Sequence, residues 1–287
     1  MTSIAFSLIG HNEAHNLPRC LESIRWADEV VYVDCASSDG SAEVARRFTE
    51  RVFSRPNLAN LNVNKTFGIE QTTADWVFYL DPDEVIPPAL GKEIRAMIAS
   101  NPPQNAFCLP RRNFYLGSWL RHGGQYPDTQ LRLFRQGRAW FPCKHVHEKL
   151  EVDGEIGSFG EAMEHYTNPT TAEVMKKLDF YSSFNADVML SEGKRPGPGM
   201  AFRYLFWTPS SRFFRRYFLK GGFRDGWPGL TVAMFDGLEN QVRFMKFCAL
   251  TRQGDAVTDG GAPAESAPAA KSTPAGEPVD TKEGQAQ

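Results

Sequence analysis

The chain has 287 residues, of which 41% are hydrophobic and 12% aromatic, and its formal net charge is −2. This composition is typical of a packed globular protein, and the near-neutral charge argues against a nucleic acid partner. The five cysteines are scattered without a CxxC pair, which excludes a zinc ribbon and favours a reducing compartment such as the cytoplasm. We recognise neither a signal peptide nor a run of about 18 apolar residues, so we expect no membrane-spanning segment.

The first hundred residues alternate between strand and helix patterns. Short apolar runs are typical of strands and occur at residues 4–9, 29–33, 51–53 and 76–80. Helix patterns lie between them, at residues 17–26, 41–48 and 64–71. Strands separated by helices form βαβ units, so we expect an α/β fold with a mostly parallel sheet.

The pattern changes after residue 101. Strand patterns lie at residues 106–109, 130–134 and 161–166. Thr170-x-x-Glu173 is a capping box and predicts a helix that extends to about residue 191. Four apolar residues are expected on one face of that helix: Val174, Leu178, Tyr181 and Val188.

A Pro/Gly-rich boundary at residues 194–199 precedes an aromatic and basic segment at 202–227 and a helix at 238–250. The tail from about residue 251 has few large apolar residues, and we expect it to be disordered. These patterns divide the chain into residues 1–105, 106–195, 196–250 and 251–287.

Three carboxylates lie within four residues at Asp81-Pro82-Asp83-Glu84, directly after the buried strand at residues 76–80. Ligands of open α/β sheets bind beyond the carboxyl ends of the strands, and Mg²⁺ is usually held by one or two carboxylates together with substrate phosphates. The Asp-x-Asp element is therefore a candidate site for a metal that carries a diphosphate. An acidic turn that caps a helix beginning near Pro88 is the alternative.

Polar residues also follow the first two strands, at Asn12-Glu13 and at Asp34, and should lie at the same sheet edge. A nucleotide along that edge would meet Asn12 and Glu13 near its ribose or base, and Asp34 would accept a hydrogen bond from a pyrimidine imide. Lys65 adds a cation for a phosphate or base. Taken singly, Asn12 is better explained as a turn residue, Asp34 as an acceptor for its own turn, and Lys65 as a solvated cation.

These motifs together resemble the glycosyltransferases of family 2. The resemblance is carried by Ser7–Ile24, by Glu29–Ser41 and by Tyr79–Glu84. Further stretches, at residues 126–135, 146–148 and 221–229, are similar to bacterial glucosyltransferases of the lipopolysaccharide core.

The resemblance implies a GT-A fold with a C-terminal helical extension and an inverting transfer of a hexose, glucose being expected, from a UDP-sugar to a lipopolysaccharide inner-core acceptor. It implies Mg²⁺ or Mn²⁺ on Asp83 and Asp81, with Asp39 among the nucleotide-binding residues. The enzyme is expected at the inner face of the cytoplasmic membrane. Polyprenyl phosphate or another envelope glycan is an alternative acceptor, and a non-catalytic sugar-nucleotide-binding scaffold is a third interpretation.

An inverting transfer needs a base for the acceptor hydroxyl. Glu148 is the first candidate and Asp128 the second, although the Glu-Asp pair that often supplies this base in the family is not found. An ordinary ion pair is the alternative for Glu148. His147 or His165 is a candidate third metal ligand, with a structural histidine as the alternative; the spacing does not favour a zinc site.

Two features concern the acceptor. Arg132 and Arg135 would bind a phosphate of the acceptor, or Arg132 would pack beneath the cleft. Residues 202–220 mix aromatic and cationic side chains at helical spacing, which favours contact with the anionic inner leaflet. A helix packed on the domain with outward-reaching arginines is the alternative.

Overall fold

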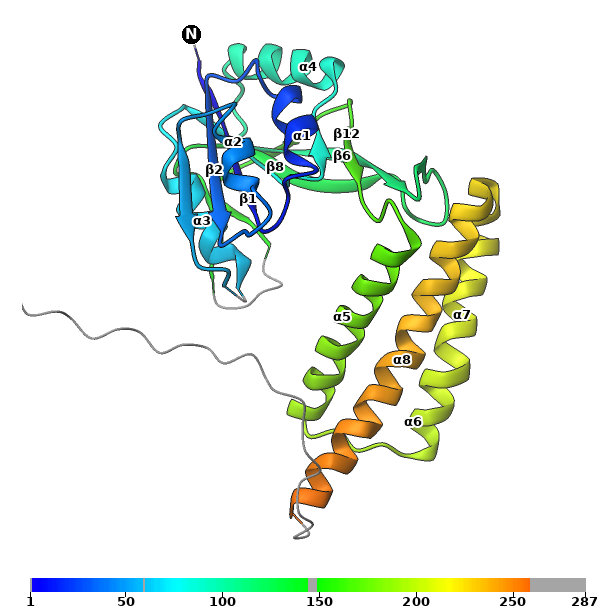
Figure 1. Ribbon diagram of the computed structural model, residues 1–287. Coiled ribbons are helices and arrows are strands. Elements are labelled where there is room, and N and C mark those ends of the chain that lie inside the picture. Colours follow the sequence, from blue (N-terminus) through cyan, green and yellow to red (C-terminus); the bar gives the residue numbers. More distant parts are fainter. Residues whose placement is uncertain (1, 59, 144–148, 259–287) are drawn as a thin grey trace, which may run out of the picture.

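The computed structural model describes residues 2–58, 60–143 and 149–258, which form a β-sheet domain and a bundle of long helices (Figure 1). The strands are β1 (Ile4–Gly10), β2 (Glu29–Cys35), β3 (Val52–Arg55), β4 (Trp76–Leu80), β5 (Glu84–Val85), β6 (Ala106–Tyr115), β7 (Ser118–Trp119), β8 (Asp128–Arg135), β9 (Ala139–Trp140), β10 (Glu151–Val152), β11 (Ile156–Ser158) and β12 (Met163–Tyr166). The helices of the sheet domain are α1 (Leu17–Ser23), α2 (Ser41–Ala45), α3 (Leu61–Glu70) and α4 (Pro88–Ala99).

The main sheet has the strand order β3-β2-β1-β4-β8-β6-β12-β5. β1 is parallel to β2 and β4, and β2 is parallel to β3, whereas β8 is antiparallel to both β4 and β6. The expected mostly parallel sheet is thus confirmed for β1 to β4 and for β6 with β11 and β12, whereas β5, β7 and β8 run antiparallel to their neighbours. Antiparallel neighbours need no helical crossover, which explains why helix patterns are missing there.

Both faces of the central strands are covered. All seven residues of β1 are buried. Phe6 and Leu8 pack in one apolar cluster with residues of α1 and α4, and Ile9 packs in another that includes Phe67 of α3. Because side chains alternate across a strand, the sheet is buried on both sides and only its ends are free for a ligand.

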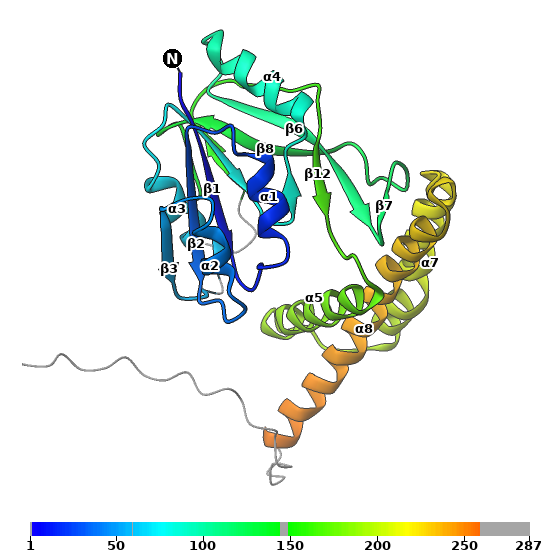
Figure 2. The same ribbon diagram turned by 45° about the horizontal axis from the view of Figure 1, so that its top comes forward.

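The C-terminal region is a bundle of three long helical segments that projects from the sheet domain (Figures 1 and 2). Its first helix is α5 (Thr171–Ser191). A second segment contains α6 (Pro198–Phe202), the π-helical η1 (Arg203–Trp207), α7 (Thr208–Phe214) and the π-helical η2 (Arg215–Leu219). The short 3₁₀-helix η3 (Gly222–Asp225) leads into α8 (Gly226–Thr258). α8 contacts both α5 and α7.

Two expectations about this bundle are wrong in part. The four residues expected on one face of α5 differ in burial, because Val174 and Leu178 are buried whereas Tyr181 is 51% and Val188 36% exposed. The buried side continues through Ser182, Ala186 and Met189, whose small members a search for large apolar residues does not find. The helical region also extends past residue 251, because α8 ends at Thr258.

Asp225 attaches the bundle to the sheet domain. Its carboxylate accepts hydrogen bonds from the backbone nitrogens of Arg121 and His122 and contacts Nδ1 of His122 at 2.8 Å. Within the described ranges, no helix combines the length and apolar composition required to cross a membrane.

Candidate active site

The polar residues at the carboxyl ends of β1, β2 and β4 lie at one edge of the sheet. Gly10 pairs with Asp34 across the β1–β2 ladder, and Leu8 pairs with Leu80, directly before Asp81. A Cβ atom on Gly10 would stand 2.7 Å from the Tyr32 hydroxyl and 3.2 Å from the Pro82 ring. The glycine therefore lets the loop after β1 approach the Asp-Pro-Asp turn.

The Asp34 carboxylate uses one oxygen within its own turn and leaves the other without a hydrogen-bond donor. The side chain is 5% exposed, and Oδ2 accepts a hydrogen bond from the Ser37 nitrogen at 3.2 Å. Oδ1 is buried without a hydrogen-bond partner. A buried carboxylate oxygen without a donor is costly, so it favours an N–H or O–H group of a ligand.

Asn12 and Asp39 fasten the first two loops to each other. Asn12 has a left-handed backbone (φ 59°), and its Oδ1 accepts a hydrogen bond from the Ser38 nitrogen at 2.8 Å. Asp39 accepts hydrogen bonds from the nitrogens of Ser41 and Ala14, both at 3.0 Å. These contacts support the turn interpretation of Asn12 and give Asp39 an equivalent role.

Glu13 stands beside Asp83 in a cavity of about 230 Å³ whose far wall is the first turns of α5. One of its oxygens, Oε2, accepts a hydrogen bond from Asn16 at 2.8 Å. Burial, reinforced by the charge of Asp83, raises the pKa of Glu13 although the Asn16 bond opposes the shift. A carboxyl group in such a setting gains by meeting a donor such as a sugar hydroxyl.

A hydrogen-bonded chain links Asp83 to Asp128 through His165 and Asn113. The Asn113 amide nitrogen donates to Asp128 at 3.1 Å and to the Gln125 carbonyl at 3.2 Å, which orients the amide. Its oxygen therefore faces Nδ1 of His165, at 2.7 Å, and Nε2 lies 3.1 Å from Asp83 Oδ2.

This chain sets the tautomer of His165. Because Asn113 presents an acceptor, Nδ1 carries the proton, and a neutral imidazole then directs the Nε2 lone pair at the Asp83 carboxylate. Two acceptors that face each other need a proton or a cation between them. A carboxylate–imidazole pair supported by a further hydrogen bond suits a divalent cation.

The remaining carboxylates of the turn belong to a buried chain of ion pairs. Arg132, 2% exposed, donates to Asp81 at 2.7 Å and to Glu84 at 2.5 Å. Arg111 contacts the same Glu84 oxygen at 3.0 Å and Asp128 at 2.7 Å. At the other end, Lys65 lies 3.5 Å from Asp81.

This ion-pair chain separates the roles of Asp81 and Asp83. Burial opposes ionisation of Asp81, but Lys65 and Arg132 hold its pKa well below the usual value. Its charge is already matched, whereas Asp83 has His165 beside it and no cationic Lys or Arg within ion-pair distance among the described residues. No three His, Cys, Asp or Glu side chains in the described part of the chain are grouped as a metal site. The residues thus fit a cation shared with substrate phosphates better than a site made by protein alone.

The two arginines expected at an acceptor phosphate are engaged elsewhere. Arg132 packs beneath the sheet edge, with its guanidinium carbon 4.2 Å from the centre of the Tyr79 ring. This is the alternative position that the sequence analysis gave for Arg132. Arg135 donates to the Pro102 carbonyl and covers Trp76, so its assignment to a phosphate is wrong. Arg132 is only 2% exposed, so its guanidinium is not accessible to an acceptor phosphate.

Of the two candidate bases, the structure describes Asp128 but not Glu148. The Asp128 carboxylate receives hydrogen bonds from Arg111, Asn113 and Gln130. Burial alone would raise its pKa, but the bonds from Asn113 and Arg111 lower it. Glu148 and His147 lie outside the described residues. Lys149, the next residue after Glu148, lines a cavity of about 650 Å³ that Asp128 and Lys65 also line.

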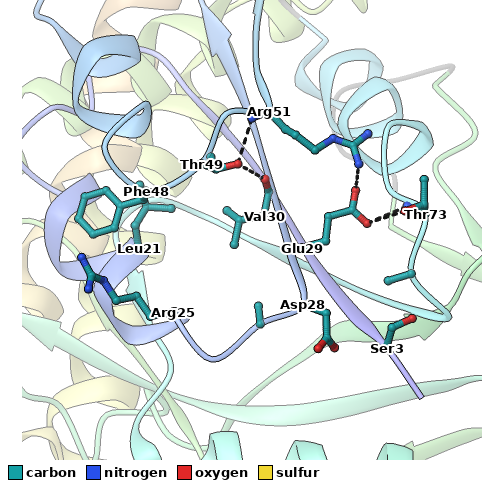
Figure 3. Close-up of a pocket in the computed structure, with 12 residues that line it drawn as sticks. Ser3, Leu21, Arg25, Asp28, Glu29, Val30, Phe48, Thr49, Arg51 and Thr73 are labelled. Carbon is teal, nitrogen blue, oxygen red and sulfur yellow. Dashed lines mark hydrogen bonds and ion pairs between the residues drawn. The ribbon is translucent and has the colours of Figure 1, made fainter. Parts of the chain in front are cut away.

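A third cavity, of about 540 Å³, lies at the opposite sheet edge (Figure 3). Its charged groups are matched internally: Glu29 pairs with Arg51 and accepts from Thr73, and Asp28 pairs with Arg95. These charged side chains already have partners within the protein, so none of them requires a ligand.

The sequence patterns missed Glu84, Arg111 and Asn113 as parts of this site. Glu84 is fully buried, and its Oε2 accepts from the Asp81 nitrogen at 3.0 Å. The sequence did contain a signal for Glu84, since three carboxylates within four residues require nearby cations. Arg111 and Asn113 lie in the middle of β6, and only the pairing of β6 with β8 and β12 reveals their partners.

Comparison with known proteins agrees with this geometry. Residues 8–152 match the family model for glycosyl transferase family 2. A lipopolysaccharide core biosynthesis glycosyltransferase, LpsC of Rhizobium meliloti, is 29% identical over 230 residues, covering 78% of this chain and 83% of that protein. An uncharacterized glycosyltransferase of Rickettsia felis is 27% identical over 244 residues, covering 78% and 84%.

Among solved structures, residues 1–349 of Staphylococcus aureus TarS are similar at a TM-score of 0.44 and 13% identity, covering 90% of this chain and 92% of that one. Glucosyl-3-phosphoglycerate synthase of Mycobacterium tuberculosis, in complex with Mn²⁺ and UDP-glucose, has a TM-score of 0.33 and 18% identity, covering 39% and 44%. The family match spans the strands and the Asp-Pro-Asp turn described above. The chain therefore belongs to glycosyltransferase family 2, and its sheet domain is the GT-A core of that family.

Proposed function

We propose that the protein is an inverting, metal-dependent transferase that moves a hexose from a UDP-sugar to a lipid-linked glycan of the lipopolysaccharide core. The observation that carries the proposal is the Asp83–His165 pair, in which Nε2 of His165 lies 3.1 Å from Oδ2 of Asp83 and Nδ1 lies 2.7 Å from the Asn113 amide oxygen. The acceptor class is supported by the 29% identical relative, whose name assigns it to lipopolysaccharide core biosynthesis. Glucose is the expected hexose, by the resemblance set out above.

The donor nucleotide would lie along the edge between Asp34 and Asp83. The unpartnered Oδ1 of Asp34 is an acceptor suited to the imide N–H of uracil. Cytosine has a lone pair at that ring position, so the site should reject cytidine nucleotides. Glu13 is suited to the ribose hydroxyls, and Lys65 to a phosphate oxygen.

Asp83 and His165 would hold Mg²⁺ or Mn²⁺ together with the diphosphate. When bound there, a divalent cation neutralises the charge that develops on the leaving nucleoside diphosphate. Asp81 would contact the donor rather than the cation, because Arg132 and Lys65 already match its charge. Asn113 keeps the His165 ring oriented throughout.

A base must remove the proton of the acceptor hydroxyl from about 2.6–3.2 Å away. Glu148 remains our first candidate. The three donors on Asp128 and its lowered pKa weigh against proton abstraction there, and support a role in orienting Asn113. His147 stays a proposed additional ligand of the cation.

The acceptor would be reached at the inner face of the cytoplasmic membrane, where a lipid-linked core is assembled. Transfer to polyprenyl phosphate or to another envelope glycan would use the same nucleotide half. A panel of acceptors therefore separates these substrates without changing the donor.

The test is UDP release by purified protein with a UDP-hexose, a truncated core acceptor and Mg²⁺ or Mn²⁺. We expect Asp83→Asn to lower kcat at least about 100-fold, as loss of a main charge-stabilising group does. Glu22→Gln, which removes an exposed carboxylate paired with Arg25, is the matched control and should leave the rate unchanged. Turnover that survives chelation and the Asp83 substitution would refute the proposal, and UDP binding without transfer to any acceptor would favour the scaffold interpretation.

A further inference from the structure

The helical segment from Pro198 to Leu219 exposes large apolar side chains along its whole length. Their exposed fractions are 62% for Phe202, 62% for Phe206, 65% for Trp207, 53% for Phe214, 51% for Phe218 and 72% for Leu219. Arg203 and Arg215 are exposed between them. We call these eight side chains the aromatic stripe. A soluble monomer rarely exposes so many large apolar groups on one helical segment without a partner.

The members of the stripe recur at multiples of four residues, as in 202, 206, 214 and 218, with Ser210 at the intermediate position. In a regular α-helix, four residues advance about 40° beyond a full turn, so four such repeats would rotate the stripe by about 160°. This segment instead contains two π-helical stretches, η1 and η2. Their wider turns, with hydrogen bonds from residue i to i+5, take up the extra residue and keep the stripe on one side.

The opposite side of the segment has the same four-residue spacing and packs inward. Pro209 is buried, Leu205, Phe213 and Tyr217 are half-buried, and the Leu205 carbonyl accepts from Gln241 of α8. α7 contacts α8 and lies on the outer side of the bundle, with α8 between it and α5 (Figures 1 and 2). The two sides of the segment thus differ consistently over its length.

The charge around the stripe is of one sign. Residues 193–224 contain eight Lys or Arg and no Asp or Glu. Arg212 and Arg216 are matched by Asp236 of α8. For Arg203 and Arg215, no ion-pair partner lies within the described part of the chain.

We infer that the aromatic stripe binds the surface of an anionic lipid bilayer, with the helical segment lying parallel to the membrane. The aromatic groups would enter the headgroup zone while the arginines meet lipid phosphates. A second copy of the chain fits less well, because a two-fold contact through this face would bring its arginines close to one another. The inference concerns the surface and holds for any donor and acceptor.

The position of the stripe also suits a lipid-linked acceptor, and this step alone rests on the proposed function. Past Leu219, the exposed Phe223 and Trp227 continue the apolar surface to the end of the bundle. There Asp225 is bonded to His122, in the loop whose Gln125 carbonyl holds Asn113. The end of the membrane-facing segment that lies next to the sheet domain is therefore joined directly to the chain that orients His165.

The test is flotation of the full chain with vesicles of phosphatidylcholine alone or mixed with phosphatidylglycerol. We expect binding to the mixed vesicles, and a loss of at least about tenfold in partitioning for Trp207→Ser combined with Phe214→Ser. Reversal of Arg203 and Arg215 to Glu should cost at least about fivefold for each cation, in the mixed vesicles only. Phe180→Ser with Met245→Ser removes two equally exposed apolar groups from α5 and α8 and should bind as the wild type does.

Circular dichroism would verify that each variant is folded. Transfer to a water-soluble truncated acceptor should be the same in Trp207→Ser/Phe214→Ser as in the wild type, so this inference and the proposed function fail separately. Equal losses in the stripe and control variants would overturn the inference, as would absence of binding to the mixed vesicles. A dimer in light scattering that the stripe variant dissociates would instead assign the surface to a second copy.

Discussion

Replacing Arg132 by methionine removes the central cation of the buried ion-pair chain while keeping a side chain of similar length. Arg132 is 2% and Glu84 0% exposed. Loss of one partner of a buried pair costs about 3–5 kcal/mol, because the other partner is left as an uncompensated charge. In this chain Glu84 keeps Arg111 at 3.0 Å and Asp81 keeps Lys65 at 3.5 Å.

These remaining partners place the expected loss near the lower limit, at about 3 kcal/mol. The loss is moderated further because Arg132 Nε and Nη1 are buried without partners, and the substitution removes both. For a protein of this size such a loss lowers Tm by about 6–12 °C. Urea unfolding and thermal melting monitored by circular dichroism would measure it.

Two further variants make the reasoning refutable. Arg138→Met removes an exposed arginine, 54% accessible and paired with Asp153, and should change stability by no more than about 0.5 kcal/mol. Adding Glu84→Gln to Arg132→Met removes the anion as well, so the double variant should be about 1–3 kcal/mol more stable than the sum of the single losses predicts. A cost below about 1 kcal/mol for Arg132→Met, or strict additivity, would contradict the charge-matching argument.

Three other substitutions test the nucleotide edge. Asp34→Asn should weaken UDP binding at least about tenfold by calorimetry without lowering Tm, since the buried Oδ1 has no partner to lose; unchanged affinity would remove Asp34 from the base site. Burial raises the pKa of Glu13, so the folded state loses stability as pH rises above the unfolded value of 4.5. Glu13→Gln should therefore melt higher than wild type at pH 7, equal it near pH 3, and bind donor more weakly; a lower Tm at pH 7 would contradict this. Burial would raise the pKa of Asp128, but hydrogen bonds from Asn113 and Arg111 lower it, so its contribution is present above the unfolded value of 3.8 and lost as pH falls through the folded one. Asp128→Asn should thus reduce stability at pH 7 and flatten the acid limb of the stability curve; an unchanged limb would refute the assignment.

Much of the sheet edge could be read from local sequence. Buried strands produce apolar runs, and parallel strands bring their carboxyl ends to one edge, so the convergence of Asn12, Asp34 and Asp83 follows from strand order alone. The ends of the strands were harder to predict from the sequence. β6 continues through Arg111 and Asn113 to Tyr115, where the sequence has no apolar run. Pairing with neighbours on both sides maintains a strand that its own composition does not indicate.

In the C-terminal bundle, local sequence patterns do not predict which side chains are buried. The sequence pattern groups Tyr181 and Val188 with Val174 and Leu178 on one face of α5, yet Tyr181 and Val188 are exposed and the small residues Ser182 and Ala186 are buried. The aromatic and basic composition of residues 202–220 was evident from the sequence. The side chains of the aromatic stripe share one side of the helix because of the two π-helical stretches. No residue type in the sequence predicts these stretches.

The sequence by itself determined the kind of chemistry, through an Asp-x-Asp turn at the end of a buried strand beside two other polar strand ends. Only the tertiary structure decided how the carboxylates divide their roles. Arg132 lies 51 residues from Asp81 and reaches it because β8 pairs with β4. Charge matching between distant strands thus leaves Asp83, next to a histidine from β12, as the carboxylate available for a cation and its diphosphate.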